Sequence, residues 1–250
     1  MPTVPMLSPI NIDDRAIRLA PYNVAPIEFH NYWNVTGYAS VVNNGHTVAV
    51  HIPKRSKLPS IKGGPLKNHY VFDSLHFHWG PDNKNGSEHH VNGTKFSMEA
   101  HIVHHSNQFQ TLKEATGHKR GIAVVAMFLQ ASAPNPNPDL DPLIEALPKI
   151  KTAKEDTHLS AQAAFEWFRS QAQPSGYYTY IGSLLNPAAG KEVVWIVYPG
   201  AVPVSASQVE AFRNLHNIEK KLITNNCQGL CPARKMTVYY CPLQAGGTLD

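Results

Sequence analysis

This 250-residue chain has only three cysteines, few charged residues and no long apolar run. Its net charge is only +4. The basic residues are scattered in pairs such as Lys119-Arg120, which is typical of solvated surface rather than of a nucleic-acid-binding patch. No apolar stretch approaches the ~20 residues that a membrane-spanning helix needs. The start at Met1 lacks the charged and apolar segments of a signal peptide, so we expect a cytoplasmic protein without a membrane span.

The cysteine pattern also limits the kinds of site that the chain can hold. Cys227 and Cys231 are close in sequence and could form a local disulfide bond, which would leave Cys241 unpaired. No Cys-x-x-Cys pair is present. This argues against a structural zinc site built from cysteines.

Short apolar runs that alternate with turn signals predict a protein made mostly of strands. Residues 122–129 and 193–198 are continuous apolar stretches, suited to strands buried on both faces. Helical spacing of apolar residues predicts helices at residues 139–147, 160–171 and 207–214, the first of them ended by Pro148. We therefore expect a mainly β (α+β) fold. One domain would span residues 1–250, on a large twisted, mostly antiparallel sheet with short peripheral helices.

Three histidines on two strand-like segments suggest a metal centre. His76 and His78 point to the same side of a strand, about 6.5–7 Å apart, so both imidazoles can reach one ion at about 2.0–2.1 Å. His101 follows two turn-rich stretches, and a neighbouring antiparallel strand could bring it to the same ion. Three imidazoles without a fourth protein ligand are typical of an open, catalytic zinc site.

Two other interpretations of this pattern have to be weighed. The chain contains 14 histidines, so one His-x-His is expected about once by chance and is weak on its own. A cupin also uses His-x-His with a glutamate and a later histidine. Cupins place that glutamate only a few residues after the second histidine, whereas Glu88 comes ten residues after His78, which disfavours a cupin.

The wider sequence resembles the α-class carbonic anhydrases. Residues 76–80, 87–91 and 99–103 follow the signature of that family in order and with suitable spacing, and the resemblance extends from about Ser8 to about Asn226. Further matching segments are residues 8–12, 43–46, 63–66, 121–124, 182–184 and 193–197. The resemblance implies the fold predicted above and a zinc enzyme that hydrates carbon dioxide reversibly to bicarbonate and a proton. It also implies a role in pH regulation and possible binding of sulfonamide-type inhibitors.

The resemblance assigns roles to particular residues. Zinc bound by three imidazoles would let a bound water lose its proton near neutral pH. His46 matches the proton shuttle, although its position after Asn-Asn-Gly also fits an ordinary turn histidine. Asn226 matches the residue whose backbone carbonyl receives a ligand N–H, and its alternative is a plain loop asparagine. The remaining implied residues are the zinc ligands His76, His78 and His101, the supporting carboxylate Glu99, the buried Glu88, and a carbon dioxide pocket of Val103, Val124, Leu184, Leu185, Asn186, Val193 and Trp195.

Several positions depart from the family pattern. Leu185 stands where the family has a threonine whose hydroxyl links the attacking oxygen to the glutamate matched by Glu88. Loss of one such contact costs about 10²–10³ in rate. Ser74 replaces a glutamine, Gln228 an arginine and Lys191 a glutamate, and the family's N-terminal aromatic stretch is missing, which suggests a truncated start. Two functions stay open: a zinc-dependent carbonate dehydratase, with activity reduced to the extent that the Leu185 contact matters, or a catalytically weak or inactive carbonic-anhydrase-like zinc or binding protein.

Overall fold

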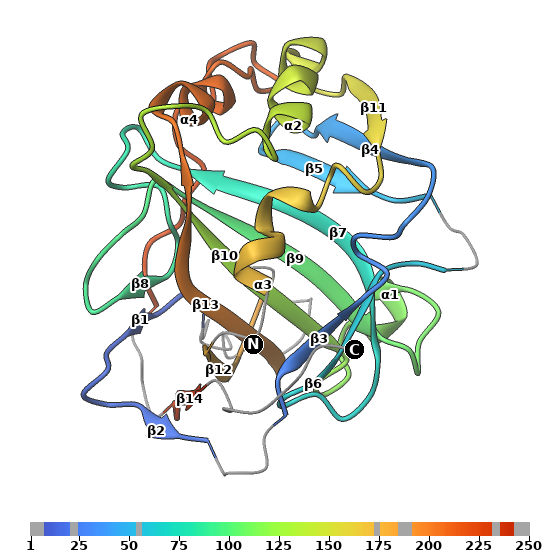
Figure 1. The fold of residues 1–250 in the computed structure, drawn as a ribbon, viewed down its shortest axis with the longest axis vertical. Coiled ribbons are helices and arrows are strands. Elements are labelled where there is room, and N and C mark those ends of the chain that lie inside the picture. Colours follow the sequence, from blue (N-terminus) through green and yellow to red (C-terminus); the bar gives the residue numbers. More distant parts are fainter. Residues whose placement is uncertain are drawn as a thin grey trace.

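A large twisted sheet of twelve strands dominates the computed structural model (Figure 1). The structure describes residues 8–20, 25–53, 57–172, 176–184, 192–231 and 236–242. The strands of this sheet are β2 (Arg18–Leu19), β3 (Ile27–His30), β4 (Tyr38–Asn43), β5 (Val48–His51), β6 (Ser60–Gly63), β7 (Tyr70–Trp79), β9 (Met98–Ser106), β10 (Ile122–Ala131), β11 (Asp156–Ser160), β12 (Tyr177–Gly182), β13 (Val193–Val204) and β14 (Tyr239–Cys241).

The strand order places the longest strands at the centre of the sheet. It runs β11-β4-β5-β7-β9-β10-β13-β12-β14-β2, and β6 joins β3 to β7. All neighbours are antiparallel except β10 with β13 and β14 with β2. A separate two-stranded parallel sheet pairs β1 (Asn11–Ile12) with β8 (His90–Val91). The prediction of a mainly β fold on a large, mostly antiparallel sheet is therefore confirmed.

The helices are short and lie around the sheet, with α2 and α4 near the top of Figure 1 and α3 in front of the central strands. Of the three predicted helices, residues 207–214 correspond to α4, which Ser205 begins with a capping box to Gln208. Residues 139–147 correspond to α2, but Pro148 continues this segment as the 3₁₀ helix η1, because a proline at the start of a helical turn has no N–H to satisfy. The helices are α1 (Leu112–Ala115), α2 (Asp141–Ala146), η1 (Leu147–Ile150), η2 (Glu166–Phe168), α3 (Arg169–Ala172) and α4 (Ala206–Arg213).

The predicted helix at residues 160–171 is wrong over its first half, and its second half is helical as η2 and α3. Ser160 is the last residue of β11 and pairs with Tyr38 of β4, and the chain then turns before η2 and α3 begin. Phe165, Trp167 and Phe168 of this segment are all buried in the core. The pairing of β11 with β4 overrides the helical spacing over the first half of this segment.

Alternation along the central strands separates the core into two faces. Leu75 and Phe77 of β7 pack into the larger cluster on one face. Val103 of β9 and Val124 of β10 belong to the smaller cluster on the other face. His76 lies between Leu75 and Phe77 in sequence, so its side chain points to the face of the smaller cluster. Among the described residues, no helix is long and apolar enough to cross a membrane.

Candidate metal centre

Three histidine side chains converge on one point at the centre of the sheet. His76 and His78 leave the same face of β7, and the β7–β9 register places His101 directly opposite His76. Their ring centroids are 5.1 Å (His76–His78), 5.2 Å (His76–His101) and 4.6 Å (His78–His101) apart. Their ligand nitrogens all lie within 4.8 Å of one another. The pairing of β7 with β9 therefore brings the three histidine side chains together, as predicted from the sequence.

Hydrogen bonds fix which nitrogen of two of these rings is free. His78 Nδ1 lies 3.2 Å from the backbone oxygen of Asn226, and His101 Nε2 lies 2.7 Å from Glu99 Oε1. With protons on those nitrogens, His78 Nε2 and His101 Nδ1 carry lone pairs directed at the shared point. His78 Nε2 is buried and has no hydrogen-bond partner among the described residues. A buried nitrogen without a partner, set among two further imidazoles, fits a zinc ion.

Glu99 organises the buried side of the centre. Its side chain is fully buried and accepts four hydrogen bonds. Oε2 accepts from the backbone N–H groups of Glu88 (2.8 Å) and His89 (2.7 Å). Oε1 lies 2.6 Å from His89 Nδ1 and 2.7 Å from His101 Nε2. The carboxylate therefore holds the ring of His101 with Nδ1 directed at the metal position.

His89, Glu99 and His101 are also close enough together to hold an ion. Their facing atoms, however, already hydrogen bond one another at 2.6 and 2.7 Å. The second nitrogen of His89 is 2.7 Å from the hydroxyl of Tyr180, which itself donates to Ser8 Oγ. This cluster is therefore a hydrogen-bonded network behind the metal position.

Burial and neighbouring charges set the protonation of these groups in opposite directions. Burial lowers the pKa of His76 well below its usual range, and the neighbouring His78 and His101 lower it further. Burial also lowers the pKa of His78, partly offset by Glu88. Burial alone would lower the pKa of His101, but the Glu99 carboxylate raises it above the ordinary value. Neutral imidazole is the form that binds metal, so two of the three ligands are already in that form at neutral pH.

Glu88 is buried beside the metal position and keeps partners in this chain. Its Oε1 accepts a hydrogen bond from the backbone N–H of Gln228 at 3.0 Å and lies 3.2 Å from His78 Nδ1. The backbone of Gln228 makes the first contact, so this contact does not depend on the Gln228 side chain. Glu88 therefore has two partners among the described residues near the metal position.

An apolar cavity of about 210 Å³ opens from the metal position on one side. His76 and His101 line it together with Val103, Val124, Leu184 and Trp195. These four residues were predicted to form a carbon dioxide pocket. Val193 packs in the same apolar cluster but does not line the cavity. Leu185, Asn186 and Lys191 lie outside the described residues.

A second, more polar cavity of about 520 Å³ lies on the other side of the centre. His46 and His78 both line it, with Asn226 and Cys227 between them in the wall. His46 is exposed and sits in a turn between β4 and β5. His46 and His78 therefore share the wall of one cavity that reaches the exposed surface at His46.

Sequence reasoning missed the groups that are assembled from distant segments. His89 and Tyr180 behind Glu99 could not be paired from the sequence, because they are contributed by a loop and by β12. All three cysteines are free, so Cys227 and Cys231 do not pair. Cys227 Sγ instead donates to the backbone oxygens of Gly86 (2.8 Å) and Trp79 (3.3 Å), and Cys231 Sγ donates to Ser8 (3.2 Å).

Comparison with known proteins agrees with this geometry. Residues 5–242 match the family described as eukaryotic-type carbonic anhydrase. Mitochondrial carbonic anhydrase 5A of Homo sapiens is 35% identical over 240 residues, which cover 93% of this chain and 75% of that protein. Carbonic anhydrase 1 of Monodelphis domestica is 33% identical over 213 residues (83% of this chain, 77% of that protein), and carbonic anhydrase 7 of Mus musculus is 34% identical over 212 residues (83% and 76%). The chain therefore belongs to the eukaryotic-type carbonic anhydrase family, whose members use zinc and act on carbon dioxide and bicarbonate.

Proposed function

We propose that this chain binds one zinc ion and catalyses the reversible hydration of carbon dioxide to bicarbonate and a proton. The observation that supports this most is the position of His76, His78 and His101, which converge on one point, with His76 and His101 lining the apolar cavity and His78 lining the polar one. When bound, zinc would lower the pKa of a coordinated water to about 7 and so supply a nucleophile near neutral pH. His78 Nε2 and His101 Nδ1 would hold the ion together with the ring of His76.

The residues of the apolar cavity suit the substrate. Carbon dioxide has no charge and no strong hydrogen-bond donor or acceptor, so Val103, Val124, Leu184 and Trp195 would bind it by contact and exclude water from its path. The indole N–H of Trp195 donates to the backbone oxygen of Ser183 at 3.2 Å. That hydrogen bond fixes the ring in the cavity wall without presenting a polar atom to the substrate.

The polar cavity provides a route for the proton from the metal centre to solvent. The imidazole of His46 would take up a proton at a ring nitrogen and release it to solvent or buffer, because the exposed His46 lines this cavity together with His78. This transfer has to follow each hydration event before the next can begin. In dilute buffer it would limit the turnover rate.

Leu185 affects the expected rate of carbon dioxide hydration. A leucine side chain has no hydroxyl to orient the attacking oxygen toward carbon dioxide, so we infer an enzyme slower than a family member with threonine at this position. A second candidate function follows from the same residue: a carbonic-anhydrase-like zinc or binding protein without useful turnover. Sulfonamide-type inhibitors would reach the same centre in either case.

Zinc analysis of a ligand variant tests the metal assignment. After dialysis against a weak chelator, the unmodified protein should retain one zinc per chain, whereas His101→Ala should lose it because two imidazoles remain. The exposed His158, which packs against Tyr38, offers a matched control. His158→Ala should retain zinc. Stoichiometric, tightly bound zinc in His101→Ala would overturn the assignment.

A further inference from the structure

The pairing between β5 and β7 stops just before the second metal ligand. The two strands pair at Val50 with Leu75 and at Ala49 with His76, and no strand residue continues the ladder. The N–H groups of Phe77 and Trp79 and the oxygen of Phe77 are instead bonded by side chains. Thr47 Oγ1 donates to the backbone oxygen of Phe77 and accepts from its N–H at 3.2 Å. Asn226 takes the remaining positions.

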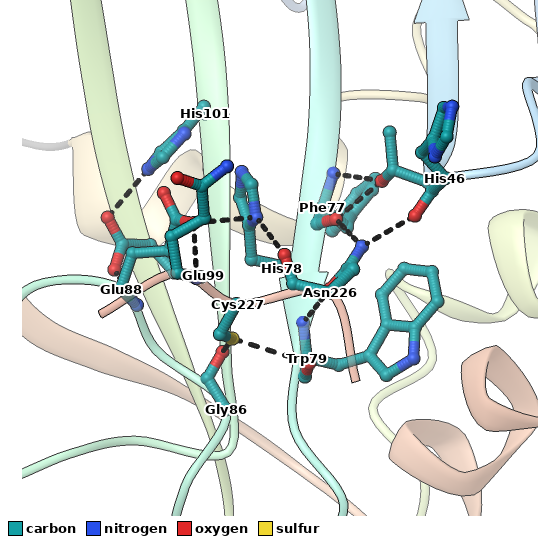
Figure 2. Close-up of polar contacts among 12 residues, drawn as sticks. His46, Phe77, His78, Trp79, Gly86, Glu88, Glu99, His101, Asn226 and Cys227 are labelled. Carbon is teal, nitrogen blue, oxygen red and sulfur yellow. Dashed lines mark hydrogen bonds and ion pairs between the residues drawn. The ribbon is translucent and has the colours of Figure 1, made fainter. Parts of the chain in front are cut away.

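Asn226 bonds the edge of β7 with both its side chain and its backbone (Figure 2). Its Oδ1 accepts from the N–H of Trp79 at 2.7 Å, and its Nδ2 donates to the backbone oxygen of Phe77 at 2.9 Å. Its backbone N–H donates to the oxygen of Trp79 at 3.0 Å, while its backbone oxygen receives His78 Nδ1 at 3.2 Å. Asn226 is therefore fixed relative to the strand that carries two of the metal ligands.

The same side chain also reaches the turn that carries His46. Nδ2 of Asn226 donates a second hydrogen bond, of 3.1 Å, to the backbone oxygen of His46. Within the turn, Asn44 Oδ1 accepts from the N–H groups of His46 and Thr47, both at 2.9 Å. The turn is thus rigid in itself. Asn226 and Thr47 attach it to β7.

We propose that the side chain of Asn226 is a positioning residue that fixes the His46 turn relative to the metal-ligand strand. This inference rests on the proposed function, because it assigns Asn226 to the proton-transfer step of that reaction. The backbone oxygen of Asn226 supports His78 whatever the side chain is. The side chain is the part that determines where His46 stands.

The test separates proton transfer from hydration. Asn226→Ala should lower kcat in dilute buffer roughly tenfold, as a misplaced transfer group does, and lower kcat/KM much less. Added imidazole should restore most of the kcat, which it would not do if the variant were merely misfolded. Asn226→Asp keeps an acceptor for Trp79 but replaces the donor with a carboxylate oxygen that faces the backbone oxygens of His46 and Phe77, so kcat in dilute buffer should fall in the same direction. Asn135→Ala, at an exposed asparagine after β10 that lines neither cavity, is the matched control and should change kcat less than about twofold.

A double variant and a measurement without turnover complete the test. If Asn226 acts through His46, Asn226→Ala combined with His46→Ala should be no slower than His46→Ala alone. Hydrogen exchange at residues 43–47 should be faster in zinc-loaded Asn226→Ala than in the unmodified protein. Additive losses in the double variant, or unchanged exchange, would overturn the positioning role. An unmodified, zinc-loaded protein without turnover in any buffer would instead overturn the proposed function.

Discussion

Replacing Glu99 by glutamine is the substitution for which the structure predicts the largest loss. The carboxylate is fully buried and accepts two backbone N–H groups on Oε2 and two imidazole nitrogens on Oε1. A glutamine can present an oxygen to only one of these pairs. Its NH₂ group must face the other pair.

Both orientations of the glutamine are unfavourable. With NH₂ toward the backbone, the N–H groups of Glu88 and His89 lose their acceptor. With NH₂ toward the imidazoles, Nε2 of His101 must become an acceptor, which moves the ring proton to Nδ1 and prevents that nitrogen from binding a metal. Two hydrogen bonds to a charged group are lost in either case, at about 1.5–3 kcal/mol each, so the free energy of unfolding should fall by roughly 3–6 kcal/mol. Zinc affinity should fall about 10–100-fold.

Denaturant unfolding and competition with a zinc chelator measure these two losses. Glu114→Gln is the matched control, because Glu114 lies exposed on α1 and accepts one backbone hydrogen bond, from Gln110 at 2.8 Å. It should change stability by less than about 0.5 kcal/mol. Unchanged zinc affinity together with unchanged stability in Glu99→Gln would refute the conclusion that Glu99 organises the buried side of the centre.

Three further predictions concern other parts of the molecule. Leu185→Thr should raise kcat/KM for hydration by up to roughly 10²-fold and tighten sulfonamide binding, and an unmodified protein already as fast as an efficient family member would show that Leu185 is not limiting. The His76 ring makes no hydrogen bond to a described residue. Ser74→Gln places an amide two residues before His76 on the same face of β7, where it can bond that ring. Zinc should therefore dissociate about tenfold more slowly in a chelator assay. An unchanged dissociation rate would contradict this. Burial lowers the pKa of His104 from 6.5 to about 3, so His104 stays neutral in the folded protein while it protonates in the unfolded one. The free energy of unfolding should therefore fall as pH drops below 6.5 toward 3, by at most about 1.4 kcal/mol per pH unit. Metal-free His104→Gln should show a shallower fall, and parallel curves for the two proteins would show that His104 does not contribute.

The sequence was sufficient where the signal is local. Alternation along a strand placed His76 and His78 on one face, and the continuous apolar runs predicted β10 and the first half of β13. The helix expected at residues 160–171 begins only at Glu166, because Ser160 pairs with β4 and the chain turns before η2. Spacing alone favours a helix there.

Contacts between distant segments could not be predicted from spacing. The register that sets His101 opposite His76 depends on the pairing of β7 with β9, across an intervening loop. The same is true of the bond between His89 and Tyr180, and of the side chain of Asn226, which reaches a turn 180 residues earlier. In each case the residue type was visible in the sequence, but its partner was determined by the fold.

The central claim is that this protein hydrates carbon dioxide at a zinc ion held by three histidines. The measurement that tests it most directly is the rate of carbon dioxide hydration by purified protein of known zinc content. We predict a rate above the uncatalysed reaction that rises in proportion to bound zinc, disappears when zinc is removed by a chelator, and returns when zinc is restored. Protein with one zinc per chain that hydrates carbon dioxide no faster than buffer alone would contradict the claim.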